Sequence, residues 1–153
     1  MRLALKGLIA IFVWQVAAAI FERLAPHQVI RWYWKVANPA WRVIAGRVPG
    51  FALVETTGRR TGRKHQVPVG ARLEDHSVWL VAGHASDAHY IKNIKANPGV
   101  RVRIGGRWRD GMAHLVPEDD ARRRAVHLNL LNGLFERVAS SDLLTVRIDL
   151  ASD

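Results

Sequence analysis

The sequence predicts a mainly β protein of the α+β class, built as an antiparallel barrel with helical insertions. Three observations lead to this fold class. Six short segments have the pattern of strands, tight turns separate several of them, and two or three short helices are expected between them. A chain of 153 residues suits a single domain with a hydrophobic core. We therefore expect one barrel domain over residues 26–153, preceded by an apolar N-terminal helix over residues 1–25.

The N-terminal segment is apolar on nearly every side. Residues 7–21 contain Gln15 as their only strongly polar member, and no polar stripe would run along a helix here. The stretch is shorter than the roughly 20 residues that a membrane span usually needs. Three interpretations remain open: a membrane-associated helix, a helix packed against the domain or a second subunit, and a cleaved signal.

The next segment predicts a helix with one polar face among aromatic residues, divided or kinked at Pro39. Its polar residues recur at steps of three and four, namely Gln28, Arg31, Lys35, Asn38 and Arg42. Four of the six tryptophans lie in this N-terminal part, at positions 14, 32, 34 and 41. Tryptophan beside arginine and lysine is typical of a membrane headgroup boundary, although the same aromatic face could pack on the sheet.

Three strands are expected after the turn at Pro49 and Gly50. Their patterns, rich in β-branched and aromatic residues, cover Phe51–Thr57, Gln66–Leu73 and Val78–Gly83. The polar residues 74–77 supply the turn between the second and third of these strands. A helix should follow, capped by Ser86 or Asp87 and running to about Ala96, where residues 97–99 would stop it.

The second half of the chain predicts three more strands and one more helix. Residues 100–104 alternate cleanly between apolar and polar, and Gly105 and Gly106 form a tight hairpin turn into residues 107–116. The acidic residues 118–120 after Pro117 mark a helix start, because carboxylates are favourable at the positive end of the helix dipole. Residues 144–150 alternate again and provide the closing strand.

The segment between the first two strands combines two glycines with four cations. Gly58 and Gly62 free the backbone to turn its N–H groups toward a ligand. Positive charge and forked donors come from the neighbouring side chains, Arg59, Arg60, Arg63 and Lys64. This combination suits a phosphate group, and a solvated hairpin tip is the alternative interpretation.

Two motifs carry a family resemblance. Thr56 to Pro68 follows the pattern T-T-G-R-[KR]-[ST]-G-x-x-[RH]-x-x-P, and Tyr90 to Pro98 follows W-x-x-N-L-x-A-N-P, with tyrosine for tryptophan and Ile94 for leucine. Over roughly residues 30–150 the chain thereby resembles the deazaflavin-dependent nitroreductase family. The resemblance implies a split β-barrel of the flavin- and deazaflavin-binding type. It also implies coenzyme F-420, an anionic deazaflavin with a phosphate and an oligoglutamate tail, in preference to FMN.

The same resemblance implies where the coenzyme binds. The phosphate would lie against Arg59, Arg60 and Thr61, with a backbone donor at Gly62. His65 stands where the family often has arginine, and Lys64 would compensate for this difference. The ring system would approach two further groups of residues, Gln66, Val67 and Pro68 on the second strand and Ala82, Gly83, His84 and Ala85 after the third.

Three residues of the second motif complete the implied site. Tyr90 is the candidate proton donor to the product, and Lys92 could meet the acidic tail of the coenzyme. Asn93 lies one helical turn from Tyr90, where it either contacts the coenzyme or fixes the helix by a hydrogen bond. The alternatives for Tyr90 and Lys92 are core packing and a solvated lysine.

Composition excludes several other chemistries. The chain has no cysteine, so thiolate catalysis and cysteine metal sites are impossible. His84 and His89 lack the spacing that places two metal ligands on one helical face, and we expect no metal. No phosphate-loop, dinucleotide-binding or serine-nucleophile motif is present. The net charge of +10 attracts polyanions, but no signature of specific nucleic-acid binding accompanies it.

The family resemblance implies an F-420-dependent oxidoreductase. A reduced deazaflavin carries the hydride itself, so the protein need only position it and exclude water. The leucine-rich residues 128–135 and the lack of tyrosine after Tyr90 favour a hydrophobic acceptor such as a quinone. We expect a cytoplasmic protein associated with lipid at the inner face of the cell membrane. The alternatives are a non-catalytic lipid or fatty-acid carrier and an electrostatic membrane-binding module, and the oligomeric state is not indicated.

Overall fold

The computed structural model describes residues 21, 24, 26, 42–128 and 142–151. The fold is mostly β, as the sequence predicts. The described part contains helix α3 (His89–Ala96) and helix α4 (Ala121–Leu128). The strands of the described part are β1 (Phe51–Thr57), β2 (Lys64–Glu74), β3 (Ser77–Gly83), β4 (Gly99–Ile104), β5 (Arg107–Val116) and β6 (Leu143–Leu150). The expectations for residues 1–25, for the helix over residues 28–41 and for most of residues 128–135 fall outside the described residues.

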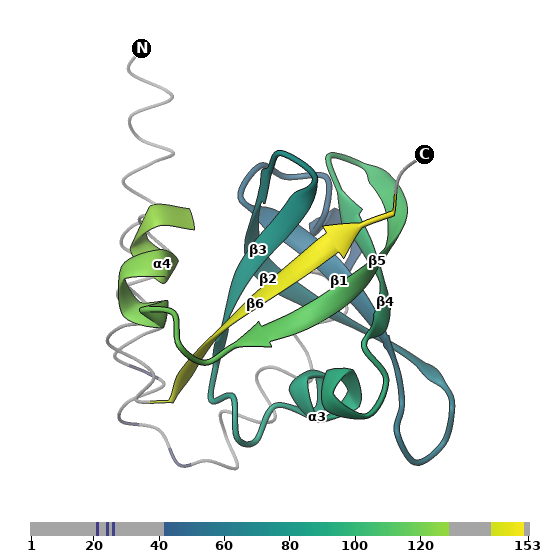
Figure 1. The fold of residues 1–153 in the computed structure, drawn as a ribbon, viewed down its shortest axis with the longest axis horizontal. Coiled ribbons are helices and arrows are strands. Elements are labelled where there is room, and N and C mark those ends of the chain that lie inside the picture. The colour runs from purple at the N-terminus through teal and green to yellow at the C-terminus, as the bar shows by residue number, and fades with distance from the viewer. Residues whose placement is uncertain (1–20, 22–23, 25, 27–41, 129–141, 152–153) are drawn as a thin grey trace.

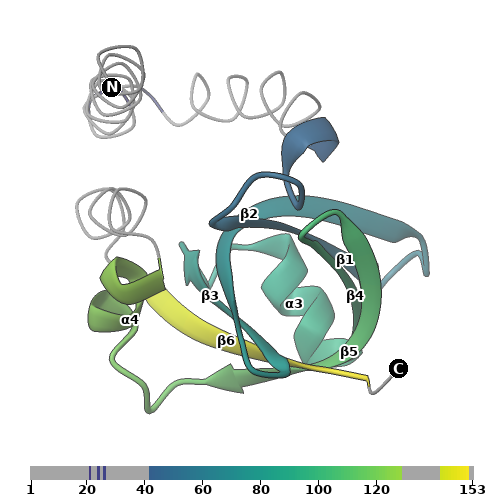
Figure 2. The same ribbon diagram turned by 90° about the horizontal axis from the view of Figure 1, so that it is seen from above.

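The six described strands close into a barrel in the order β1-β2-β3-β6-β5-β4 (Figure 1). Every neighbouring pair is antiparallel, including β1 with β4, which completes the ring. Figure 2 looks down on this ring, with α3 inside its outline and α4 outside it. Because each strand has two partners, the described barrel exposes no free strand edge of the kind that invites unwanted pairing.

Alternate residues of the strands fill the barrel interior. Residues with 0% exposure come from four different strands: Ala52, Val54, Val78, Leu80, Val102, Val146 and Ile148. Ile91 and Ile94 of α3 belong to the same core cluster, so α3 covers one end of the barrel (Figures 1 and 2). Burying each isoleucine stabilises this arrangement by about 1.5 to 3 kcal/mol.

The turns agree with the sequence, whereas the start of α3 does not. Gly105 and Gly106 have φ values of 58° and 81°, as the predicted hairpin turn requires. The helix begins at His89, not at a cap on Ser86 or Asp87. Its N-cap residue is Ala88, which makes no side-chain capping bond. The expected cap was therefore wrong, and Ser86 instead donates its backbone N–H to the Asp142 carboxylate at 2.7 Å.

Helix α4 lies on the outer side of β3. Its buried residues Ala121, Ala125 and Leu128 recur at steps of four and three, and they pack with Val81 in a second hydrophobic cluster. At its N-terminus the side chain of Asp120 accepts a hydrogen bond from the Arg123 backbone N–H at 3.0 Å. The acidic segment therefore does start a helix, and Asp120 is the capping residue.

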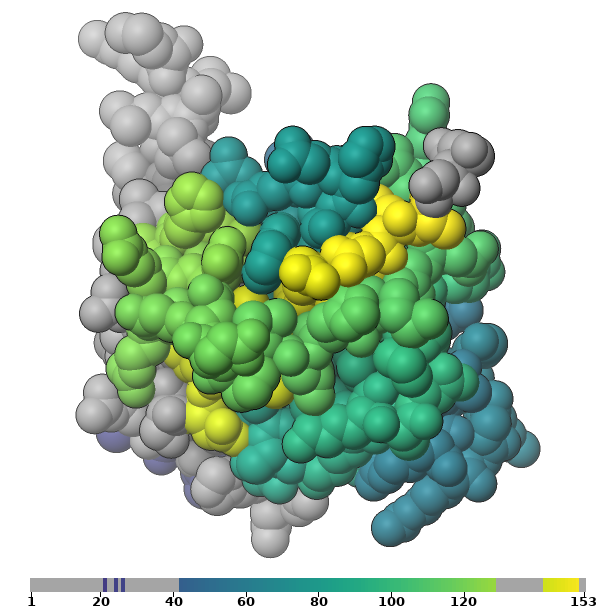
Figure 3. All heavy atoms as spheres, viewed as in Figure 1, coloured from purple at the N-terminus to yellow at the C-terminus, as the bar shows by residue number. Residues whose placement is uncertain are grey.

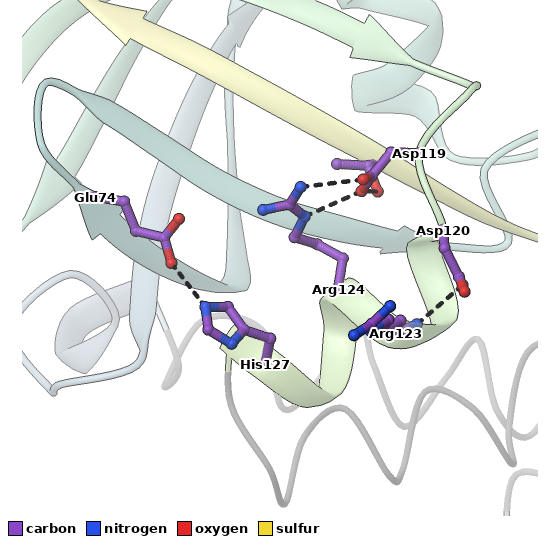
Figure 4. A network of polar contacts seen from close by, with 7 residues as sticks. Glu74, Asp119, Asp120, Arg123, Arg124 and His127 are labelled. Carbon is purple, nitrogen blue, oxygen red and sulfur yellow. Dashed lines mark hydrogen bonds and ion pairs between the residues drawn. The ribbon is translucent and has the colours of Figure 1, made fainter.

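An ion pair at the start of α4 contacts two strands of the barrel, through Thr145 of β6 and Trp79 of β3 (Figure 4). The Arg124 guanidinium donates twice to the Asp119 carboxylate, each time at 3.0 Å, and the Thr145 hydroxyl donates to the same carboxylate at 2.7 Å. The guanidinium also lies 4.2 Å from the ring centre of Trp79. The hydrogen bond from Arg124 is the main cause that lowers the pKa of Asp119 below its usual value of 3.8.

This ion pair predicts a pH-dependent effect of Asp119→Asn. A carboxylate whose pKa is lowered by folding stabilises the folded protein above its unfolded pKa, and the contribution disappears as the pH falls through the folded pKa. We expect the variant to lose about 1 to 3 kcal/mol at pH 7, and much less near pH 3. Urea unfolding at both pH values measures this. Asp120→Asn is the matched control, since asparagine also caps helices well; equal losses in the two variants would contradict the prediction.

Candidate functional site

The β1–β2 connection is a tight, glycine-dependent loop. The Gly58 N–H donates to the Arg63 carbonyl and the Gly62 N–H to the Gly58 carbonyl, both at 2.8 Å. Gly62 has a φ of 67°, which favours glycine. A Cβ atom on Gly58 would come within 2.9 Å of the His65 Nε2 atom, so a side chain there would require the imidazole to move. The sequence prediction of a backbone donor at Gly62 needs correction, because that N–H already closes the loop.

The loop presents other donors to solvent. The side chains of Arg59, Arg60, Thr61 and Lys64 are all exposed, and the loop projects from the surface in Figure 3. Within the described part of the chain, the backbone N–H groups of Arg60 and Thr61 make no hydrogen bond. Lys64 lies at the start of β2, and its ammonium donates to the Thr57 hydroxyl at 2.9 Å. Two unpaired N–H groups among several cations form a suitable cradle for an anion.

Asn93 connects this loop to helix α3. Its amide nitrogen donates to the buried Thr56 hydroxyl at 3.1 Å. Its amide oxygen accepts from the Arg59 backbone N–H at 3.2 Å and from the Arg59 guanidinium at 3.4 Å. Asn93 is only 4% exposed, so its amide is occupied within the protein. Of the two roles considered for Asn93, these contacts support a structural one: it holds the first motif against the second.

Two other candidate residues of α3, Tyr90 and Lys92, lie on the same helix as Asn93. Tyr90 is partly buried and packs against the barrel core, as its core-packing interpretation predicts. The Lys92 ammonium lies 3.8 Å from the Asp87 carboxylate, and its side chain is 37% exposed. Such a weak, exposed ion pair can open at little cost. Lys92 is therefore accessible to an acidic ligand, whereas most of Tyr90 is not.

The loop after β3 leads directly into α3. Ala82 is 0% exposed and Ala85 is 6% exposed, so both side chains pack in the core, and only their backbone could approach a ligand. His84 is exposed and has a φ of 51°, an uncommon value for a residue other than glycine. Gly83 forms the end of β3, opposite Leu143 of β6. This loop and the β1–β2 connection lie at the end of the barrel that α3 covers (Figure 1).

Val67 and Pro68, two of the β2 residues that the resemblance assigns to the ring system, face opposite sides of the sheet. Val67 packs against the barrel core, whereas its neighbour Pro68 lies on the outer face, because successive side chains of a strand alternate. Pro68 is opposite Leu53 of β1 in the strand register. The outer face of β2 therefore offers a proline surface without an N–H donor, and Val67 could contact a ligand there only through its backbone.

Sequence reasoning placed Gln66 beside the ring system but missed its partner Glu55. Glu55 is 9% exposed although it lies on the outer side of β1, and its carboxylate accepts a hydrogen bond from the Gln66 amide at 2.9 Å. The Arg101 guanidinium of β4 lies 4.0 Å from the same carboxylate. The pairing depends on the strand register, which places Glu55 opposite both partners. No local sequence pattern carries that information.

A groove of about 360 Å3 also runs along α4, lined by Asp119, Asp120, Arg123, Arg124 and His127. Its charged groups are largely paired with protein groups, Arg124 with Asp119 and His127 with Glu74 (Figure 4). It contains neither of the two sequence motifs. The cradle at the β1–β2 connection is therefore the stronger candidate for the functional site.

A family model described as F-420H(2)-dependent quinone reductase matches residues 31–150 of the chain. The protein belongs to this family. The match includes both motifs and all six strands of the described barrel. Coenzyme F-420 is therefore the cofactor, and the enzyme is an F-420-dependent reductase, as the motif resemblance predicted. The family takes its name from quinone reduction, not from the nitro reduction for which the resemblance was named.

Solved structures support the same fold for this F-420-dependent reductase. An F-420-H2 dependent reductase, FDR-A, shares 25% identity at a TM-score of 0.51, covering 65% of this chain and 93% of its own. Another F-420 reductase shares 16% identity at a TM-score of 0.52, covering 69% and 90%. HutZ, the heme storage protein from Vibrio cholerae, shares 14% identity at a TM-score of 0.52, covering 75% and 88%, and it shows the fold alone. No curated protein matches the chain.

The cradle fits the chemistry of this coenzyme. Phosphate and oligoglutamate are both anionic, and the cradle combines the exposed cations of Arg59, Arg60 and Lys64 with two unpaired backbone donors. The side chain of buried Asn93 holds the backbone of the cradle by accepting a hydrogen bond from the Arg59 N–H. The individual contacts of these residues with the coenzyme remain predictions.

Proposed function

We propose that this reductase passes hydride from reduced coenzyme F-420 to a quinone or a similarly hydrophobic acceptor. One observation carries the proposal: a family named for quinone reduction matches residues 31–150, and within that range the cationic β1–β2 loop is tied to α3. In the described residues no group of three or more histidine, cysteine, aspartate or glutamate side chains is arranged to hold a metal. The chain's own residues then have to bind, orient and shield the reactants.

In this proposal the β1–β2 loop binds the phosphate. Arg59, Arg60 and Thr61 contact the phosphate oxygens, and Lys64 adds charge from the first residue of β2. Lys92, whose exposed ion pair with Asp87 can open at little cost, meets the acidic tail. Gly62 supplies the turn that the loop requires. His65 supports the loop from beside Gly58, and its departure from arginine is compensated by Lys64.

The remaining residues position the reaction. When bound, reduced F-420 supplies a hydride, and two-electron reduction of a quinone to a hydroquinone also requires protons. Pro68 offers the ring an apolar surface, and the backbone of residues 82–85 closes the site from the β3 side. Tyr90 is the proposed source of a proton for the reduced acceptor, delivered from its phenolic hydroxyl and restored from solvent.

We further propose that the enzyme works beside an anionic membrane. The segment just before β1 exposes apolar side chains, with Val43 62%, Ile44 45% and Val48 40% exposed. Arg42 and Arg47, also exposed, accompany them. Apolar side chains beside arginine suit a lipid interface. None of the helices in the described residues has the length and apolar character that crossing a membrane requires.

A turnover assay tests the acceptor and the membrane together. Reduced F-420 is mixed with enzyme and a menaquinone dissolved in anionic vesicles, in neutral vesicles, or replaced by a short-chain soluble analogue. We expect oxidation of the coenzyme with all three, fastest with anionic vesicles, and slower turnover with a nitroaromatic acceptor. The absence of oxidation above background with every acceptor would contradict the quinone proposal. Equal rates with both vesicle types would contradict the membrane proposal alone.

The alternative function, a non-catalytic lipid carrier, would be supported by one outcome of these experiments. The departure at His65 from the family's usual arginine is the observation that motivates it. A carrier would yield extractable lipid after purification and would show no affinity for F-420. Binding of F-420 to the wild-type protein, followed by its fluorescence, would remove this alternative.

A further inference from the structure

The largely buried carboxylate of Glu55 lies on the outer face of the barrel, close to the β1–β2 loop that forms the anion cradle. Glu55 alternates along β1 with core residues Val54 and Thr56, and its side chain is 10% exposed. It has two polar partners in the described structure, the Gln66 amide at 2.9 Å and the Arg101 guanidinium at 4.0 Å. A carboxylate can accept about four hydrogen bonds. The Glu55 carboxylate therefore has capacity for further hydrogen bonds besides the one from Gln66, although its side chain is little exposed.

The contact fixes the orientation of the Gln66 amide. An ionised carboxylate only accepts hydrogen bonds, so Gln66 must turn its NH2 group toward Glu55. The amide oxygen of Gln66 then points elsewhere. Among the described residues, no donor forms a hydrogen bond to that oxygen. The side chain is partly exposed, so a ligand can reach it.

The position of this acceptor suits a ligand that also occupies the cradle. In the strand register, the pair of Thr57 and Lys64 lies on one side of Glu55 and Gln66, and the pair of Leu53 and Pro68 lies on the other. Alternate residues of a strand face the same side of the sheet. A cation, a hydrogen-bond acceptor and an apolar proline surface thus follow one another along the outer face of β2.

We propose that Glu55 is a positioning residue, which holds the Gln66 amide oxygen toward the bound coenzyme as an acceptor for a ring N–H group. The proposal rests on the proposed binding of F-420 across the β1–β2 loop and the outer face of β2. A deazaflavin carries a pyrimidinedione ring whose edge includes an N–H donor. The Arg101 guanidinium lies 4.0 Å from the Glu55 carboxylate and is itself held by Asp110 at 3.3 Å.

A double-mutant cycle on coenzyme affinity tests the proposal. Glu55→Gln removes the dictated orientation, because a carboxamide can both donate and accept. Gln66→Leu removes the acceptor. We expect each single variant to weaken F-420 binding about three- to tenfold, and the double variant to be no weaker than Gln66→Leu alone. Fluorescence titration measures all three. Losses that multiply in the double variant would overturn the proposal, and so would unchanged affinity in Glu55→Gln.

A second measurement separates this inference from the proposed function. In wild-type protein without coenzyme, the side-chain NH2 signal of Gln66, identified by its loss in Gln66→Leu, should exchange slowly with solvent; in Glu55→Gln it should exchange faster. Equal exchange would overturn the positioning role even if F-420 binds. Slow exchange in a wild-type protein that does not bind F-420 would overturn the ligand contact and the proposed function, leaving only the orientation. Glu118→Gln, the same change at an exposed glutamate, should alter neither measurement.

Discussion

Replacing Arg60 with alanine is expected to weaken the binding of coenzyme F-420 about 10- to 100-fold. A hydrogen bond from a guanidinium to an ionised phosphate contributes about 1.5 to 3 kcal/mol. The Arg60 side chain is exposed and makes no hydrogen bond or ion pair within the described part of the protein. Its removal should therefore leave the stability of the fold unchanged. Titration of the variant with oxidised F-420, followed by fluorescence, measures the effect, and thermal unfolding checks the fold.

Arg63→Ala is the matched control for Arg60→Ala. Both variants remove one exposed arginine from the same loop, so both reduce the long-range attraction of the coenzyme equally. Only Arg60 belongs to the expected phosphate contacts, and we expect Arg63→Ala to change affinity by less than about threefold. Equal losses in the two variants, disappearing together in high salt, would show that general charge rather than a phosphate contact attracts the coenzyme.

The second large effect is expected for Asn93→Leu. Leucine fills a similar space but removes every side-chain hydrogen bond of Asn93. The buried Thr56 hydroxyl and the Arg59 N–H are then left without partners. Each unsatisfied group costs about 1 to 3 kcal/mol, so we expect the free energy of unfolding to fall by about 2 to 5 kcal/mol. Coenzyme affinity should fall as well, because the loop is no longer held against α3. Urea unfolding and F-420 titration measure the two effects.

Thr56→Val removes the contact of Asn93 with Thr56 and so separates it from the contact of Asn93 with Arg59. Valine replaces the hydroxyl with a methyl group and leaves the Arg59 contacts of Asn93 in place. We expect this variant to lose about 1 to 2 kcal/mol of stability while keeping its affinity for F-420 within about twofold. A loss of affinity as large as that of Asn93→Leu would mean that the position of α3, rather than its bond to the loop, supports the coenzyme.

The order and type of the elements could be predicted because they depend on local patterns. Phe51–Thr57 was predicted with its observed bounds, since β-branched residues lie between clear turn signals. The start of α3 could not be predicted in this way. Ser86 resembles a capping residue, but both its side chain and its backbone N–H bond the Asp142 carboxylate, 56 positions away in the sequence. A tertiary contact of this kind overrides a local propensity.

The same distinction between local patterns and tertiary contacts applies to the candidate site. The cations and glycines of the β1–β2 loop are contiguous, so their sequence alone predicts an anion-binding turn. The partners of Glu55 and Asn93 come from other elements, Gln66 and Arg101 for the first and Thr56 and Arg59 for the second. These contacts require the strand register and the placement of α3 across the barrel end. The use of the Gly62 N–H inside the loop likewise depends on the detailed turn geometry, which the pattern of residue types does not specify.

The closing position of β6 has a consequence for how the chain acquires its fold. β6 pairs with β3 on one side and with β5 on the other, although it is the last strand of the described chain to be synthesised. Until residues 143–150 leave the ribosome, β3 and β5 each keep an unpaired edge, and such edges promote aggregation. Because the ring closes through contacts distant in sequence, its folding should be slow for its size. Nascent chains stalled before residue 143 should therefore be the species most dependent on chaperones.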